Sequence, residues 1–104
     1  VIHTEMDIKN YKSNYNKSPG CTQKEIDGLE AFLNDGFTDT FRALHPEDVK
    51  YSWWSYRFNS REKNTGWRLD YFLTSDRILN NVKTAEIHNN IFGSDHCPVS
   101  ITLA

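Results

Sequence analysis

Apolar residues recur at helical spacing in one segment near the start of the chain. The members of this stripe are Ile26, Leu29, Phe32 and Leu33. Such spacing is typical of one buried face of a helix. The preceding sequence TQKE is a capping box, in which Thr22 caps a backbone N–H and Glu25 reaches back to the N–H of Thr22. The sequence NDG, ending at Gly36, suits a helix end. We therefore expect a helix that begins at the Thr22 cap and ends at NDG.

Strands are predicted in four segments that follow this helix. WRLDYFL, residues 67–73, alternates Trp67, Leu69, Tyr71 and Leu73 with Arg68, Asp70 and Phe72. PVSITL, residues 98–103, also alternates, and YSWWSY, residues 51–56, has high strand propensity. VKTAEIHNN, residues 82–90, is the weakest of the four patterns. The order is one helix followed by several strands.

The segments between these elements are long and polar. IKNYKSNYNKSP, residues 8–19, carries lysine and asparagine but no acid, and RFNSREKNTG, residues 57–66, is likewise basic and contains asparagine. Residues 37–46 read as a turn or a single helical turn, and SDRIL, residues 75–79, as a short helical turn. Long ordered loops in a compact domain are usually functional, so we expect the residues that carry the chemistry to lie in these loops.

Composition narrows the class of protein. The 104 residues suffice for one small domain, with 38% hydrophobic and 25% charged residues. The net charge of −2 provides no overall basic field, so nucleic-acid binding has to come from local patches or a metal. The chain lacks a hydrophobic run of membrane-spanning length and a signal-peptide pattern, so we expect an intracellular protein with no membrane association. Cys21 and Cys97 allow one disulfide. The chain opens on Val1, and VIHTEMD reads like a strand end, which suggests a piece of a longer protein.

The stretch FGSDHCPVS, residues 92–100, places Asp95 beside His96 just before the last predicted strand. A carboxylate suits a hard cation such as Mg²⁺, and a histidine can act as a general base or as a donor to a phosphate. The alternative is an ordinary turn, in which Asp95 caps the backbone and His96 points to solvent.

Asp70 gives His96 a candidate partner. An aspartate on a neighbouring strand is the usual way to fix the tautomer of a catalytic histidine. Arg68 lies on the same predicted face as Asp70, so a purely structural ion pair between Arg68 and Asp70 is the competing interpretation.

The aromatic and basic residues also allow two interpretations. Trp53 and Trp54 are consecutive and point to opposite faces of a strand, so one of them can line a pocket or stack on a nucleotide instead of entering the core. The two basic loops are either solvated surface or the walls of a groove for a phosphodiester backbone. Their cationic and amide side chains include Lys12, Lys17, Arg57, Arg61, Lys63 and Asn64.

Several motifs together resemble a known family. GSDHCPV resembles the closing motif of the endonuclease/exonuclease/phosphatase superfamily, and NTGWRLDYFLTS, residues 64–75, resembles the signature of its exonuclease III class of apurinic/apyrimidinic (AP) endonucleases. HTEMDIKNYKSN and DTFRALHPEDVKYSWWSY follow the same class in the same order, so the resemblance covers essentially the whole chain. One departure is Ala43, where the class would have a basic residue or histidine.

The resemblance implies a fold and a place within it. The family fold is a DNase I-like, four-layer α/β sandwich of two sheets flanked by helices. Residues 1–104 look like the C-terminal portion of that single domain. The family's metal-binding Glu, active-site Tyr and water-aligning Asp-x-Asn would then lie upstream of Val1.

The resemblance also implies roles for individual residues. It places His96 at the scissile phosphate, Asp70 as the residue that orients it, and Asp95 at the metal, which would be Mg²⁺ or Mn²⁺. The residues that match the pocket for a flipped-out abasic sugar are Trp53, Trp67 and Leu69. Those that match or flank DNA-contacting loop positions are Asn10, Lys12, Asn14, Arg57 and Asn64.

The expected function is that of a DNA repair nuclease acting on double-stranded DNA. It would hydrolyse the phosphodiester 5′ to an abasic site, with additional 3′→5′ exonuclease or 3′-phosphodiesterase activity. Two alternatives stay open from the sequence. One is a phosphatase or non-specific nuclease of the same superfamily, and the other is a non-catalytic fragment that binds DNA weakly.

Overall fold

A computed structural model describes residues 1–104 and contains both helices and strands, as predicted. The helical elements are η1 (Glu5–Asp7), α1 (Tyr11–Asn14), α2 (Gln23–Asn34), α3 (Thr40–Leu44), η2 (Arg57–Asn59) and η3 (Asp76–Asn81). The strands are β1 (Phe37–Asp39), β2 (Trp53–Trp54), β3 (Gly66–Trp67), β4 (Leu73–Ser75), β5 (Val82–Ile87) and β6 (Val99–Leu103). None of the helices has both the length and the hydrophobicity needed to cross a bilayer.

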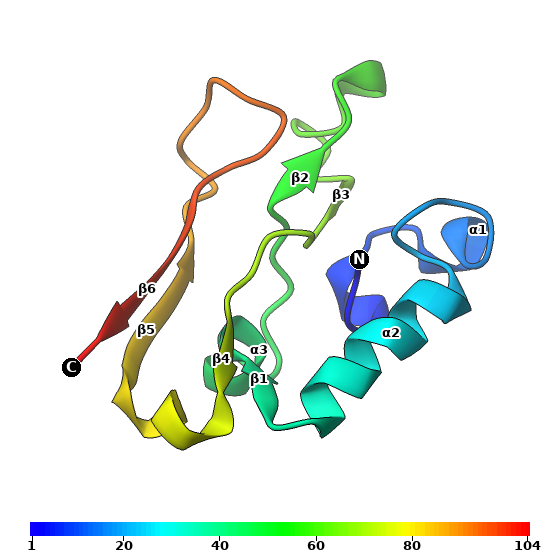
Figure 1. The fold of residues 1–104 in the computed structure, drawn as a ribbon. Coiled ribbons are helices and arrows are strands. Elements are labelled where there is room, and N and C mark those ends of the chain that lie inside the picture. The colour runs from blue at the N-terminus through cyan, green and yellow to red at the C-terminus, as the bar shows by residue number, and fades with distance from the viewer.

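The strands form three antiparallel pairs, β1–β4, β2–β3 and β5–β6. Figure 1 shows the β5–β6 hairpin on one side of the molecule and α2 on the other, with the short strands between them. The loop that joins β5 to β6 and the loop that joins β2 to β3 project from the same end (Figure 1). The predicted last strand and the strand that begins at Val82 are confirmed.

Two predicted strands are shorter in the structure than in the sequence pattern. Residues 51–56 contribute only β2, and residues 67–73 split into β3 and β4. Directly after β3 the chain pairs with another segment, because Trp67 bridges to Ile8 and the backbone N–H of Arg68 donates to the carbonyl of Asp7 at 2.7 Å. The helical turns in residues 37–46 and 75–79 are confirmed as α3 and η3, whereas β1 and the single turn α1 lack a clear sequence signal.

Helix α2 begins at the predicted cap, with one difference of detail. The Thr22 hydroxyl accepts the N–H of Glu25 at 3.3 Å. The Glu25 carboxylate accepts from the N–H of Gly20 at 2.8 Å and from the Thr22 hydroxyl at 2.7 Å, instead of from the N–H of Thr22. Of the predicted stripe, Leu29 is buried, but Phe32 is 59% exposed and only meets the edge of Phe37.

The core consists of two hydrophobic clusters. The larger one joins α3, β2, β5 and the residue after His96, and its buried members are Phe41, Tyr51, Trp54, Ala85, Ile87 and Cys97. The smaller one contains Ile2, Ile8 and Cys21. Because the two cysteines lie in different clusters, both are free thiols, and the disulfide that the sequence allowed is absent.

A charged network lies between these clusters. Arg68 is 0% exposed and contacts two carboxylates, with Nε 2.9 Å from Oδ1 of Asp7 and Nη1 2.9 Å from Oδ1 of Asp39. Arg42 is a second cation at Asp7, with Nη2 2.7 Å from Oδ1. The predicted alternative of an Arg68–Asp70 ion pair is therefore wrong. The reason is that Arg68 finds two better-buried acids that are distant in sequence.

Candidate active site

Three chain segments meet at the candidate site through backbone hydrogen bonds. The N–H of Ser52 donates to the carbonyl of Trp67 at 2.9 Å, and the N–H of Cys97 donates to the carbonyl of Ser52, also at 2.9 Å. The N–H of Trp54 donates to the carbonyl of Asp95 at 3.0 Å. The segment around β2 therefore lies between the segments that carry Asp70 and His96.

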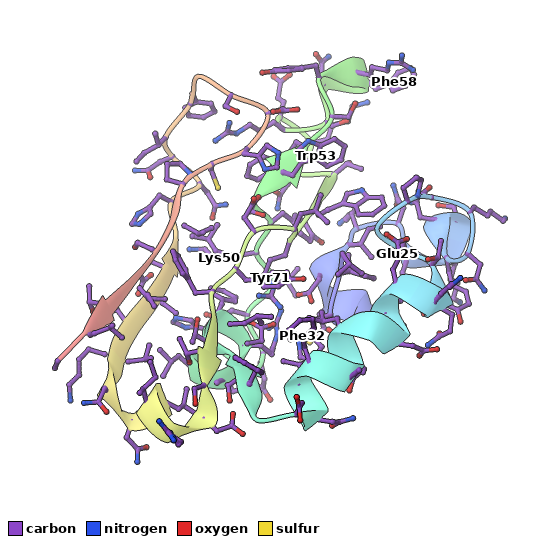
Figure 2. The ribbon with its side chains drawn as sticks, viewed as in Figure 1. Glu25, Phe32, Lys50, Trp53, Phe58 and Tyr71 are labelled. Atoms are coloured by element: carbon purple, nitrogen blue, oxygen red, sulfur yellow. The ribbon has the colours of Figure 1, made fainter.

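The structure separates the roles of the two consecutive tryptophans. Trp54 is buried, and its indole N–H donates to Oδ1 of Asn64 at 3.1 Å. Gly66 packs directly beneath this ring, where an added Cβ would lie 2.5 Å from Nε1 of Trp54. Only glycine fits that position. Trp54 is thus a core residue. Trp53 (Figure 2) is half-buried, its indole N–H donates to Asp95, and its backbone pairs with that of His96.

Asp70 and His96 are in direct contact. Nδ1 of His96 lies 2.6 Å from Oδ2 of Asp70, and the two side chains are 45% and 36% exposed. The backbone N–H of His96 donates to the Ser94 hydroxyl at 3.1 Å, so Ser94, and not Asp95, accepts at this turn. The imidazole is accessible to a substrate and already paired with a carboxylate. Such a pair can take a proton from water or donate to a phosphate oxygen.

Asp95 is held by Trp53. Oδ2 of Asp95 accepts the indole N–H of Trp53 at 3.1 Å, and this hydrogen bond lowers the pKa of the Asp95 carboxyl below its ordinary value. The carboxylate therefore suits one position in the oxygen shell of a hard cation. The structure shows no group of three or more His, Cys, Asp or Glu side chains that could hold a metal ion. Asp95 fits as one ligand of such a cation.

The residues predicted to line a sugar pocket lie around β3. The rings of Trp53 and Trp67 meet edge to face with their centroids 6.0 Å apart. Trp67 and Leu69 pack against the smaller hydrophobic cluster and close to Gly20. Trp67 and Leu69 are half-exposed and present an apolar surface next to Asp70 in the chain.

Of the predicted DNA-contacting residues in the first loop, Asn10 and Lys12 are exposed around α1. Asn14 is engaged internally, because its amide donates to the carbonyl of Asn10 at 2.7 Å and its Oδ1 accepts from Ser18 at 2.7 Å. Asn14 therefore shapes the loop and has less capacity for an external phosphate.

In the second loop, Arg57 is exposed in η2, beside Phe58, which is 82% exposed and has a positive φ of 60°. Figure 2 shows Phe58 standing out at the far end of this loop. Asn64, by contrast, is committed to Trp54 through Oδ1.

The contacts of Arg61 do not fit the role in a phosphodiester-binding groove that the sequence suggested for it. Its guanidinium stacks between the rings of Trp54 and Phe92, with Cζ 4.5 Å and 4.1 Å from their centroids. It also donates to three backbone carbonyls of the β5–β6 loop, at 2.9 Å to Asn89, 2.7 Å to Ile91 and 3.3 Å to Ser94. Arg61 fastens the loop that leads to Asp95 and His96, and is not a free phosphate ligand.

We expect Arg61→Ala in the full-length protein to loosen that loop. Hydrogen bonds from a charged donor contribute about 1.5–3 kcal/mol each, and solvent exposure reduces this contribution. We therefore expect the free energy of local opening of the loop to fall by about 1.4 kcal/mol or more, which is a tenfold change in the opening equilibrium. Amide hydrogen exchange across residues 89–94 should accelerate by about that factor. Lys63→Ala, which removes an exposed cation from the same loop, is the matched control. Unchanged exchange in Arg61→Ala would contradict the clamp.

The residues that support the site carry no recognisable signal in the sequence. Ser52 is 0% exposed and its hydroxyl donates to Asp70 at 2.9 Å, yet a serine before WW carries no distinctive signal. Asp7 and Asp39 anchor Arg68 from 61 and 29 residues away. No local pattern predicts contacts over such separations.

Comparison with known proteins places this geometry in a family. The model of the endonuclease/exonuclease/phosphatase family matches residues 1–96. This chain belongs to that family. Nucleases of the family are generally dependent on a divalent metal, which agrees with the charged carboxylate at Asp95.

Individual family members are similar over the whole chain. The DNA repair nuclease APEX1 of Danio rerio is 46% identical over 105 residues, covering 100% of this chain and 34% of its own length. An exodeoxyribonuclease of Bacillus subtilis is 42% identical, covering 99% of this chain and 41% of its own length. The crystal structure of the AP endonuclease LMAP from Leishmania major superposes with a TM-score of 0.91 at 33% identity, over 99% of this chain and 32% of that one. The chain thus spans about two fifths or less of the length of these relatives.

Proposed function

We propose that this chain is part of a DNA repair nuclease that hydrolyses the phosphodiester 5′ to an abasic site in double-stranded DNA. We further propose that it corresponds to the C-terminal portion of the nuclease domain and acts inside the cell. The names of its relatives support the class of reaction. The observation that carries the proposal is the accessible Asp70–His96 pair, with Nδ1 and Oδ2 2.6 Å apart.

Each candidate residue then has a role. Nε2 of His96 faces the phosphate, where it takes a proton from the attacking water or donates to a phosphate oxygen, and Asp70 orients the ring. Asp95 is one ligand of a divalent cation, for which we propose Mg²⁺. The cation, when bound, offsets charge on the phosphate and the leaving oxygen.

Substrate recognition falls to the remaining residues. Trp53, Trp67 and Leu69 form the apolar wall that receives the extruded abasic sugar. Asn10, Lys12 and Arg57 contact the DNA backbone from the exposed loops, while Asn14 and Asn64 hold those loops in shape.

The test is an incision assay with the full-length protein. Two otherwise identical duplexes, one with a single abasic site and one intact, are compared in Mg²⁺ and in a chelator. We expect the abasic duplex to be incised about tenfold or more faster than the intact duplex, since a shaped pocket discriminates at least to this extent. We expect incision to stop in chelator. Equal rates on both duplexes would favour a non-specific nuclease or phosphatase instead.

The isolated chain provides the matched comparison. It supplies one candidate metal ligand, Asp95, and spans about two fifths or less of the length of its relatives. We therefore expect residues 1–104 alone to show no turnover on the abasic duplex under conditions in which the full-length protein cuts it. Turnover by the isolated chain would mean that Asp70, Asp95 and His96 suffice.

A further inference from the structure

The hydroxyl of Ser52 is the buried neighbour of the exposed Asp70–His96 pair. The residue is 0% exposed. Its Oγ lies 2.9 Å from Oδ2 of Asp70, 2.9 Å from the backbone nitrogen of Leu69 and 3.0 Å from the backbone nitrogen of Asp70. All three polar contacts of this hydroxyl go to the segment that carries Asp70.

The donors and acceptors in this arrangement can be assigned. A serine hydroxyl has one hydrogen to donate and two lone pairs to accept with. The two backbone N–H groups can only donate, so they occupy the two lone pairs of Ser52. The single hydroxyl hydrogen therefore goes to the Asp70 carboxylate. Ser52 cannot turn this hydrogen elsewhere without giving up a buried hydrogen bond.

The assignment extends to His96. Oδ2 of Asp70 accepts from Ser52 and is also the atom 2.6 Å from Nδ1 of His96. With Asp70 ionised, Nδ1 carries the hydrogen, and Nε2 is the nitrogen left for the substrate. Asp70 and His96 are more than a third exposed, and an exposed ion pair contributes too little energy to fix the geometry of its side chains. The buried hydroxyl is what restricts the rotamer of Asp70.

We propose that Ser52 is a positioning residue for phosphodiester hydrolysis, which fixes the Asp70 carboxylate and through it the tautomer and orientation of the His96 ring. This inference rests on the proposed function, because it presumes that His96 acts on a phosphate. Ser52 is also joined through its own backbone to Trp67 and Cys97. One residue thus links the segments that carry Asp70 and His96.

The experiment compares three variants of the full-length protein. Ser52→Ala removes the hydroxyl, and Ser52→Cys keeps nearly the same shape with a weak donor. Thr40→Val removes another buried hydroxyl, one that donates to the carbonyl of Phe72 at 2.9 Å and makes no hydrogen bond to Asp70. Steady-state incision of abasic duplex gives kcat and KM. The low-field proton resonance of His96 Nδ1–H, assigned by its loss in His96→Ala, reports the contact with Asp70.

We expect Ser52→Ala to lower kcat by about 10–100-fold, the usual effect of losing a partner of a functional side chain, with KM close to that of the unmodified protein. The kcat of Ser52→Cys should lie between that of Ser52→Ala and that of the unmodified protein. The Nδ1–H resonance should shift or broaden in both, and Thr40→Val should leave kcat and the resonance unchanged. If Ser52→Ala does not fold, Ser52→Cys decides.

The outcomes separate the two proposals. Normal kcat and an unmoved resonance in Ser52→Cys, with His96→Ala inactive, would overturn the role of Ser52 and leave the nuclease function standing. Absence of incision by the unmodified protein would overturn the proposed function. In that case the resonance still shows whether Ser52 holds Asp70 against His96.

Discussion

Replacing His96 by alanine in the full-length protein is expected to lower kcat for incision of abasic DNA by about 10²–10⁴-fold, the usual contribution of a general acid or base. The imidazole is accessible and makes no contact that a fold depends on, since its partner Asp70 is itself exposed. DNA binding, measured by fluorescence anisotropy in chelator, should change little.

Asp70→Ala should have a similar effect, because the ring then loses the acceptor that fixes its tautomer. The two residues act as a unit, so the double variant should be scarcely slower than either single variant. The matched control is His88→Ala. His88 is half-buried, and its ring also has a side-chain partner, because Nε2 lies 2.8 Å from the Ser100 hydroxyl, but it makes no hydrogen bond to Asp70. Incision at the normal rate by His96→Ala would show that the Asp70–His96 pair takes no part in the reaction.

Arg68→Met is expected to lower the free energy of unfolding by about 3–5 kcal/mol, because it removes the buried cation that two buried carboxylates share and leaves Asp7 with Arg42 alone. Asp7 and Asp39 are 0% and 3% exposed. Chemical denaturation of the full-length protein at neutral pH measures the loss. Arg77→Met, at an exposed arginine with no ion pair in the structure, should stay within about 0.5 kcal/mol.

The pH dependence gives a second measure of the same network. Burial alone raises the pKa of Asp39, but hydrogen bonds from His3 and Arg68 outweigh it, and the net pKa lies below the ordinary 3.8. The pKa of Asp7 is lowered in the same way, since Arg68 and Arg42 outweigh its burial. A depressed carboxyl pKa contributes stability above the unfolded-state pKa, and that contribution is lost as pH falls toward the folded-state pKa.

The difference in unfolding free energy between the unmodified protein and Arg68→Met should therefore be largest near pH 7. It should narrow below about pH 4, where the carboxyls begin to protonate in the unfolded chain. A difference that stays constant down to pH 3 would show that Arg68 stabilises the fold by packing, for example against Phe41 and Tyr71, whose rings lie 5.4 Å and 5.1 Å from its Cζ. An unchanged stability at neutral pH would contradict the network itself.

The sequence by itself determined the elements whose signals are local. The cap at Thr22 sets the start of α2, and the alternation in residues 98–103 sets β6, because each signal depends on neighbours within a few residues. The motifs around Asp70 and Asp95–His96 also identified the family and the candidate residues. These features need no knowledge of what packs against them.

Only the tertiary structure decided how the polar residues are partnered. Alternation placed Arg68 and Asp70 on one face, yet Arg68 turns inward to Asp7 and Asp39, while Asp70 meets Ser52 and His96. Arg61 reads as a surface cation and instead holds the loop before Asp95. The physical reason is that a buried charge or hydroxyl is stable only with partners, and the chain brings those partners together from positions 18 to 61 residues apart.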